Sequence, residues 1–164
     1  PPALREELSA GRANFPSVKS GLQEGALRIA FCGNEAKRPV AANFSDVEGR
    51  RKWMQAAGVD VQINAGWLDM FGYEMPADEC ADWSRYLNEH MMRGVTGSQF
   101  LKPLATIPLQ SGKLAAKVLA EALDVPKRDV RIVSGDTARQ KLLEVVGLSA
   151  EIVRARLLPT TPIG

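Results

Sequence analysis

The sequence predicts a mixed α/β fold, in which helices pack on a mixed, partly parallel sheet within a single small domain. From Ser45 onward, helical patterns alternate with short β-branched stretches, which is typical of an α/β layer with right-handed crossovers. The 164 residues are 45% hydrophobic, so the chain is long and apolar enough to bury one core. We expect about five or six strands in the sheet.

Residues 1–43 are irregular in pattern. Two short apolar runs, residues 26–31 and 38–44, flank Gly33 and Asn34. Because Gly and Asn tolerate turn conformations, this arrangement predicts a β-hairpin. The residues before it, which are rich in Gly, Pro and Ser, are expected to form an irregular connection.

The first strong helix signal begins at Ser45, in the stretch Ser-Asp-Val-Glu. The Ser45 hydroxyl can accept a backbone amide while Glu48 reaches back to the cap, which is the capping-box arrangement. We expect a helix from there to about Ala57, ended by Gly58 and followed by a strand over residues 59–64.

A second helix is predicted to start near Pro76, because proline favours the first helical turn. Gly94 ends its pattern, and apolar residues at helical spacing mark its core face. These residues are Cys80, Trp83, Leu87 and Met91.

The remaining elements continue the alternation. Residues 100–109 predict a strand entered at Pro103 and left at Pro108. The later elements are a helix over residues 112–123 with Ala115, Val118, Leu119 and Ala122 on one face, strands over residues 129–135 and 141–147 that turn at Gly135, and a final helix capped by Ser149.

Composition excludes several classes of protein. The formal net charge of +2 is too small to indicate a nucleic-acid or membrane partner for the whole chain. No apolar run reaches the roughly 18 residues that a bilayer requires, and residues 1–12 lack the apolar core of a signal peptide. Cys32 and Cys80 have no metal-ligand spacing, so we expect reduced thiols, with Cys80 buried. These features predict a cytoplasmic protein without a membrane partner.

The sequence offers little for catalysis. His90 is the only histidine, whereas a metal site needs three or four ligands that converge. We expect His90 at the surface or boundary of its helix, on a different face from Glu89. The chain has no G-x-S-x-G elbow and no phosphate-binding glycine motif. We therefore predict no catalytic residue, no metal ligand and no cofactor held by this chain.

One candidate binding site is an aromatic loop. Trp67, Phe71 and Tyr73 follow the strand over residues 59–64, and loops after strands often carry ligand sites in α/β folds. These rings could line a pocket for a small carboxylate, with Arg38 as a bidentate clamp. The alternatives are that the rings plug the top of the core and that Arg38 is an ordinary exposed arginine.

A second candidate is a basic patch around the last two predicted strands. It comprises Lys127, Arg128, Arg131 and Lys141. Such a cluster suits phosphates and predicts contact with RNA or another polyanion. Asp124 and Asp129 are interleaved with the cations, and no aromatic residue is available to stack bases, so a solvated face is the alternative.

Residues 1–110 resemble the aminocarboxymuconate-semialdehyde decarboxylase-like branch of the amidohydrolase superfamily. The resemblance is carried by PPAL at 1–4, DVEGRRKWMQAAGVDVQIN at 46–64, DMFGYEMPADECADWSRYLNEHM at 69–91 and FLKPLATIPLQ at 100–110. It implies part of a TIM barrel, a relationship to metal-dependent lyases and hydrolases that usually hold zinc, and a place for Arg38 near a substrate-carboxylate arginine.

The chain departs from that family at its metal site. The family's His-x-His pair lies upstream of the region that resembles residues 1–4, and its later histidines and catalytic aspartate lie beyond residue 110. The resemblance therefore implies only the first strand-helix units and no closed barrel. We expect a truncated or chimeric amidohydrolase-like segment that is inactive alone.

Residues 112–158 instead resemble the C-terminal half of the YggU-like family, small α/β proteins of unknown function. GKLAAKVLAEALDVPKRDVRIVSGDTARQKLLEV at 112–145 and GLSAEIVRARL at 147–157 carry this resemblance. We expect residues 1–110 and 111–164 to pack as one globular unit. The alternatives to the amidohydrolase-like function are a non-enzymatic polyanion-binding module and a chimeric chain with no ligand, whose exposed sheet edges would pair in a homodimer.

Overall fold

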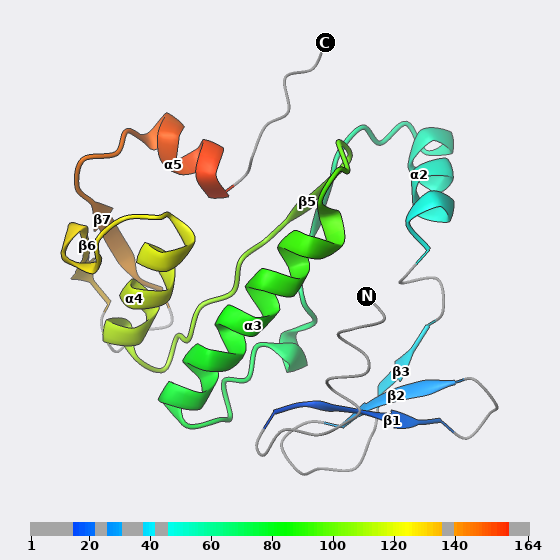
Figure 1. The fold of residues 1–164 in the computed structure, drawn as a ribbon, viewed down its shortest axis with the longest axis horizontal. Helices are drawn as coiled ribbons and strands as arrows, with labels where there is room; N and C mark the ends of the chain where they lie inside the picture. The colour runs from blue at the N-terminus through cyan, green and yellow to red at the C-terminus, as the bar shows by residue number, and fades with distance from the viewer. Residues whose placement is uncertain (1–14, 22–25, 31–37, 42–45, 136–139, 158–164) are drawn as a thin grey trace. The chain divides into compact units, whose positions relative to one another are not determined.

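The computed structural model describes residues 15–21, 26–30, 38–41, 46–135 and 140–157 (Figure 1). The chain divides into two compact units, residues 1–62 (unit 1) and residues 63–164 (unit 2). The segments defined by the two resemblances, residues 1–110 and 111–164, do not coincide with these units. The described strands form three small sheets, and the fold class is mixed α/β.

Unit 1 contains a three-stranded antiparallel sheet in the order β1-β2-β3. Its strands are β1 (Ser17–Ser20), β2 (Leu27–Ala30) and β3 (Arg38–Val40). Leu27 is opposite Val40, so the predicted hairpin between the two apolar runs is confirmed, while its turn at Gly33 and Asn34 lies outside the described residues. Strand β1 was not predicted, because its sequence is largely polar and only Val18 is buried.

Helix α2 (Val47–Ala56) follows the sheet in the chain and ends before Gly58, which has a φ of +66°. The predicted capping box is wrong in detail, and Ser45 itself lies outside the described residues. Asp46 is the N-cap, and its Oδ1 accepts the Gly49 amide at 2.8 Å. Glu48 does not reach back to the cap, because its carboxylate is held by the Arg51 guanidinium one turn later.

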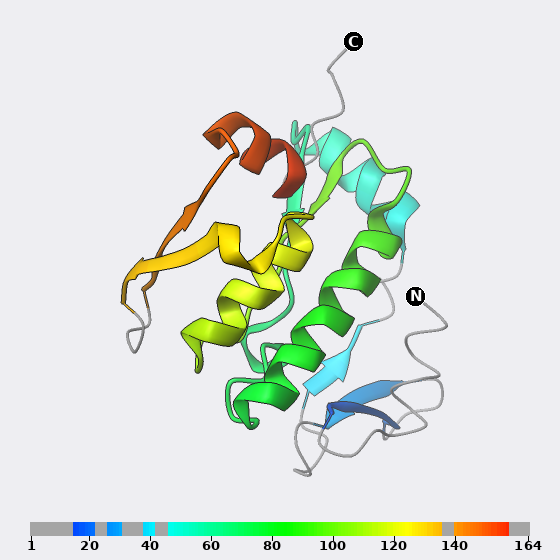
Figure 2. The same ribbon diagram turned by 60° about the vertical axis from the view of Figure 1, so that its left-hand side comes forward.

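Unit 2 is built around two long helices, α3 (Ala77–Val95) and α4 (Gly112–Ala122), which pack side by side (Figure 2). Strands β4 (Gln62–Asn64), which begins at the last residue of unit 1, and β5 (Leu101–Pro103) form a two-stranded sheet. The other elements are the 3₁₀ turns η2 (Leu68–Met70) and η3 (Lys127–Asp129), strands β6 (Val130–Ser134) and β7 (Leu142–Val145), and helix α5 (Ala150–Leu157).

The prediction of one mixed sheet of five or six strands was wrong, since the described strands form three separate small sheets. The predicted strand over residues 100–109 is reduced to β5, which ends at Pro103. Pro103 and Pro108 lack the amide hydrogen that a sheet ladder needs, and the Leu104 amide makes a last bond to the Asn64 carbonyl at 2.7 Å. Helix α3 packs on β5 and helix α4 packs on β6. The β4–β5 sheet and the β6–β7 sheet are therefore separate.

The antiparallel pairing of β6 with β7 confirms the predicted C-terminal hairpin. Its inner face packs on α4 through a cluster of Ala116, Ala120 and Val130, supported by the partly buried Ile132 and Val145. Ser149 caps α5 as predicted, since its hydroxyl accepts the Ile152 amide at 3.3 Å. The described sheets do not close into a barrel, and the partial TIM-barrel relationship stays a prediction from the resemblance.

The core face of α3 is largely as predicted. Cys80, Trp83 and Leu87 are buried, while Met91 is only half-buried. His90 was expected at the surface or boundary, and this was wrong: only 6% of its surface is exposed. The reason is helical phase, because His90 lies one turn after Leu87 on the same face and its ring contacts that of Tyr86, with the centroids 4.4 Å apart.

On α4, Ala115 and Val118 are buried as predicted, but Ala122 is exposed, while Ala116 and Ala120 complete the buried face. Ala116 and Ala120 pack against Val130 of β6, and α4 also contacts α3. The Arg85 guanidinium on α3 bridges to Glu121 on α4, with Nε donating to the carboxylate at 2.5 Å. Within the described residues, no helix has the length and apolar character needed to cross a membrane.

Candidate functional site

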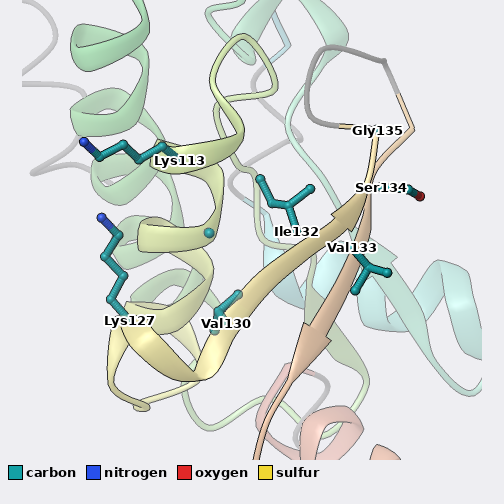
Figure 3. Close-up of a pocket in the computed structure, with 8 residues that line it drawn as sticks. Lys113, Lys127, Val130, Ile132, Val133, Ser134 and Gly135 are labelled. Atoms are coloured by element: carbon teal, nitrogen blue, oxygen red, sulfur yellow. The ribbon is translucent and has the colours of Figure 1, made fainter.

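An open groove of about 470 Å³ lies between the first turn of α4 and strand β6 (Figure 3). Apolar side chains and two lysines line it. The lining residues are Lys113, Ala116, Lys127, Val130, Ile132, Val133, Ser134 and Gly135. The two lysines come from segments fourteen residues apart (127 − 113), and the fold brings them to one surface.

Lys113 is positioned by the start of α4. Ser111 is the N-cap, and its hydroxyl accepts the Leu114 amide at 3.4 Å. The first turn of α4 has no acidic residue, so Lys113 adds its charge to the positive end of the helix dipole. This end of α4 is therefore electropositive.

Lys127 is positioned by the turn η3 that follows Pro126. The Asp129 amide donates to the Pro126 carbonyl at 2.9 Å, which closes the turn and directs the chain into β6. Figure 3 shows the Lys113 and Lys127 side chains extending on the same side of the groove. Both are exposed, and neither forms an ion pair or hydrogen bond within the part of the chain that the structure describes.

The far end of the groove depends on Gly135, the residue that follows β6. Gly135 has a φ of +80°, and a Cβ there would lie 2.1 Å from the Gln140 carbonyl oxygen, so only glycine fits. The Lys141 ammonium donates to the Gly135 carbonyl at 3.0 Å. Lys141 therefore contacts the edge of the groove at Gly135.

Of the four predicted polyanion-binding residues, Lys127 is the one that lines the groove. Arg128 is exposed beside it, although the Asp129 carboxylate lies 3.8 Å from the Arg128 guanidinium. Arg131 is directly opposite Glu144 in the hairpin register, on the face away from Val130 and α4. Sequence reasoning missed Lys113, because no local pattern links the start of α4 to η3.

The aromatic loop after β4 is tied to α3 and to the residues before α4. Trp83 Nε1 donates to the Met70 carbonyl at 2.6 Å, and Cys80 Sγ donates to the Phe71 carbonyl at 3.4 Å. Gln110 Nε2 reaches the carbonyls of Gly72 and Met75, both at 3.2 Å. These bonds fix the course of residues 70–75 over the core.

Within this loop the rings of Phe71 and Tyr73 are tilted against each other, with centroids 5.6 Å apart, and Trp67 is half-buried. Burial raises the pKa of the Tyr73 phenol above its ordinary value of 10.0, the neighbouring Cys80 adds to this rise, and a hydrogen bond with Thr106 opposes it. Arg38 is on β3, opposite Ile29, in unit 1. The use of these four residues as a carboxylate pocket stays a prediction.

The described residues contain no group of three or more His, Cys, Asp or Glu side chains placed to hold a metal ion. Burial raises the pKa of the Cys80 thiol, with a smaller contribution from the Glu74 carboxylate, and hydrogen bonds with Gln110 and Ser84 oppose the rise. A thiol with a raised pKa is a poor nucleophile at neutral pH. No protein-family model matches the chain.

Proposed function

We propose that the chain is a non-enzymatic binding module that holds the phosphate groups of a polyanion at the α4–β6 groove. The observation that carries the proposal is the presence of Lys113 and Lys127, without ion-pair partners among the described residues, on one groove. Two ammonium groups on one concave surface repel each other, and a bound anion relieves that repulsion. Arg128, exposed next to Lys127, extends the basic surface.

Binding of this kind should depend steeply on salt. Each phosphate neutralised by a cationic side chain releases counterions, so the logarithm of the binding constant falls linearly with the logarithm of salt concentration. We would measure the binding of a fluorescein-labelled single-stranded RNA by anisotropy over a series of salt concentrations. Unlabelled inorganic polyphosphate is the competitor, which separates phosphate recognition from recognition of a nucleic acid.

The test uses three charge-removing variants. Lys113→Ser and Lys127→Ser should each weaken binding and reduce the salt slope by about 0.7. Lys117→Ser is the matched control, because Lys117 is exposed on α4 but does not line the groove. An equal loss of RNA affinity in all three variants would show that the attraction is not localised at the groove, and it would overturn the proposal. Inorganic polyphosphate is expected to displace the labelled RNA. If unlabelled RNA displaced it and polyphosphate did not, the partner would be a nucleic acid rather than phosphate groups alone.

A second candidate function is favoured by the fixed aromatic loop between β4 and α3. We propose that this loop, with Trp67, Phe71 and Tyr73, binds a small aromatic carboxylate, in keeping with the amidohydrolase-like resemblance of residues 1–110. Saturable binding of benzoate or a dicarboxylate, measured by isothermal titration calorimetry, would support it, provided that Trp67→Phe keeps binding and Trp67→Ala loses it. Unchanged binding in Trp67→Ala would remove this candidate.

The resemblance also leads us to propose that the amidohydrolase-like segment is inactive by itself and that exposed sheet edges pair in a homodimer. Size-exclusion chromatography with light scattering, followed by elemental analysis of the same fraction, tests both. A dimeric mass supports edge pairing, and a monomeric mass contradicts it. Stoichiometric zinc would contradict the proposal of an inactive segment.

A further inference from the structure

Two cationic side chains lie directly opposite each other on the sheet of unit 1. The register of β1 and β2 pairs Val18 with Ile29 and Lys19 with Arg28. Val18 and Ile29 are buried, so their face of the sheet is turned to the interior of unit 1. Because side chains alternate along a strand, Lys19 and Arg28 share the opposite face.

The arrangement of Lys19 and Arg28 is unfavourable for the sheet alone. Directly opposed residues of an antiparallel pair have Cβ atoms only about 5 Å apart, and like charges at this spacing destabilise the pair. Lys19 is exposed and Arg28 is partly exposed, and neither has an ion pair or hydrogen bond within the described ranges. An anion that contacts both cations would convert a repulsive pair into a binding site.

The neighbours of the pair carry no charge. The positions around it on the same face are small or apolar, and they are Ser17, Gly21, Ala26, Ala30 and Pro39, of which Ala30 is buried. Gly21 and Ala26 continue the ladder, since the Gly21 amide donates to the Ala26 carbonyl at 2.8 Å. These positions place no carboxylate beside either cation.

We propose that Lys19 and Arg28 form a second anion site, for a ligand with at least two adjacent phosphate groups. The planar guanidinium of Arg28 can bind two oxygens of one phosphate, and the ammonium of Lys19 can act as a point charge on the next. The site shares no residue with the α4–β6 groove, and the two belong to different units.

A site-resolved titration tests the proposal. The full ¹⁵N-labelled chain would be titrated with inorganic tripolyphosphate, and backbone amide shifts would be followed by nuclear magnetic resonance. Shifts at residues 17–20 and 27–30 are expected. Lys19→Gln should weaken binding at these resonances by about tenfold, whereas Lys19→Arg, which keeps the charge, should retain it.

A stability measurement distinguishes this site from an ordinary surface pair. Without ligand and at low salt, Lys19→Gln should raise the unfolding midpoint of unit 1, because it removes the like-charge repulsion, while Lys19→Arg should not. Tripolyphosphate should raise the midpoint of the wild-type chain more than that of Lys19→Gln. Equal shifts in both chains would overturn the proposal.

The groove provides the internal control. Lys127→Gln should weaken binding at groove residues such as Ile132 and leave the shifts at residues 17–20 unchanged, so failure of one site is separable from failure of the other. Tripolyphosphate shifts confined to the groove would overturn the second site alone. Shifts produced by a short RNA at these residues, but never by tripolyphosphate, would also overturn it, since recognition would then require the nucleic acid.

Discussion

Asn88 and Thr106 form a reciprocal pair of hydrogen bonds between α3 and the segment after β5. Asn88 Nδ2 donates to the Thr106 carbonyl at 2.9 Å, and the Thr106 amide donates to Asn88 Oδ1 at 2.7 Å. Thr106 is buried, with 7% of its surface exposed, and residues 104–108 form no regular element that could satisfy its backbone. The Asn88 side chain therefore replaces a missing strand partner.

The first prediction concerns this pair. Asn88→Ala should lower the free energy of unfolding of unit 2 by about 2 kcal/mol, because both the amide and the carbonyl of Thr106 would be left without a partner in a buried position. Urea unfolding followed by circular dichroism measures the change. Gln99→Ala, which shortens an exposed polar side chain, is the control and should stay within about 0.5 kcal/mol of wild type. Equal stabilities of the two variants would contradict the role of Asn88.

The second prediction concerns the end of α4. Arg156 on α5 donates from its guanidinium to the carbonyls of Leu123 and Asp124, which the helix leaves without amide partners. Arg156→Ala should release α5 and speed hydrogen exchange over residues 150–156. Arg154→Ala removes an equal charge from the same helix and should leave exchange nearly unchanged. Slow exchange in Arg156→Ala would show that α5 is held by other contacts.

The third prediction concerns two glycines with left-handed backbone. Gly135 and Gly147 have φ angles of +80° and +82°, but a Cβ at Gly147 would meet no atom within 4 Å, whereas one at Gly135 would meet the Gln140 carbonyl. Gly147→Ala should lower the free energy of unfolding by about 1 to 2 kcal/mol, because alanine is strained in the left-handed conformation. Gly135→Ala should cost more and alter the shape of the groove. Chemical denaturation of both variants measures the difference, and equal costs would show that the turn relaxes.

The fourth prediction concerns alkaline pH. Burial raises the pKa of the Cys80 thiol above its ordinary value of 9.0, so the thiol holds its proton more firmly in the folded chain than in the unfolded chain. This contribution to stability is complete below about pH 9 and is lost as the pH rises through the folded pKa. Unfolding free energies measured from pH 7 to pH 10.5 should fall more steeply for wild type than for Cys80→Ala. If the free energy of unfolding fell equally steeply with pH in both chains, the Cys80 thiol would have the same pKa in the folded and unfolded states.

Several local features were predictable from the sequence because they depend on residues within one or two helical turns. The bounds of α4 and the Ser149 cap follow from spacing and capping chemistry over a few residues. The burial of His90 was also encoded locally, since it lies seven residues after Trp83 (90 − 83), but the polar character of histidine outweighed its helical phase. The choice of Asp46 as N-cap was a competition between adjacent polar residues that spacing could not resolve.

By itself, the sequence determined the mixed α/β class, the order of elements from α2 to α5 and the hairpins β2–β3 and β6–β7, because each rests on local periodicity and turn chemistry. Only the tertiary structure decided that the strands form separate sheets and that Lys113 joins Lys127 at one groove, while Arg131 and Lys141 do not line it. These outcomes depend on which face of α4 is buried against β6 and on where Pro103 and Pro108 stop the ladder of β5. Such long-range packing sums many weak contacts between segments distant in sequence, and short-range patterns do not specify it.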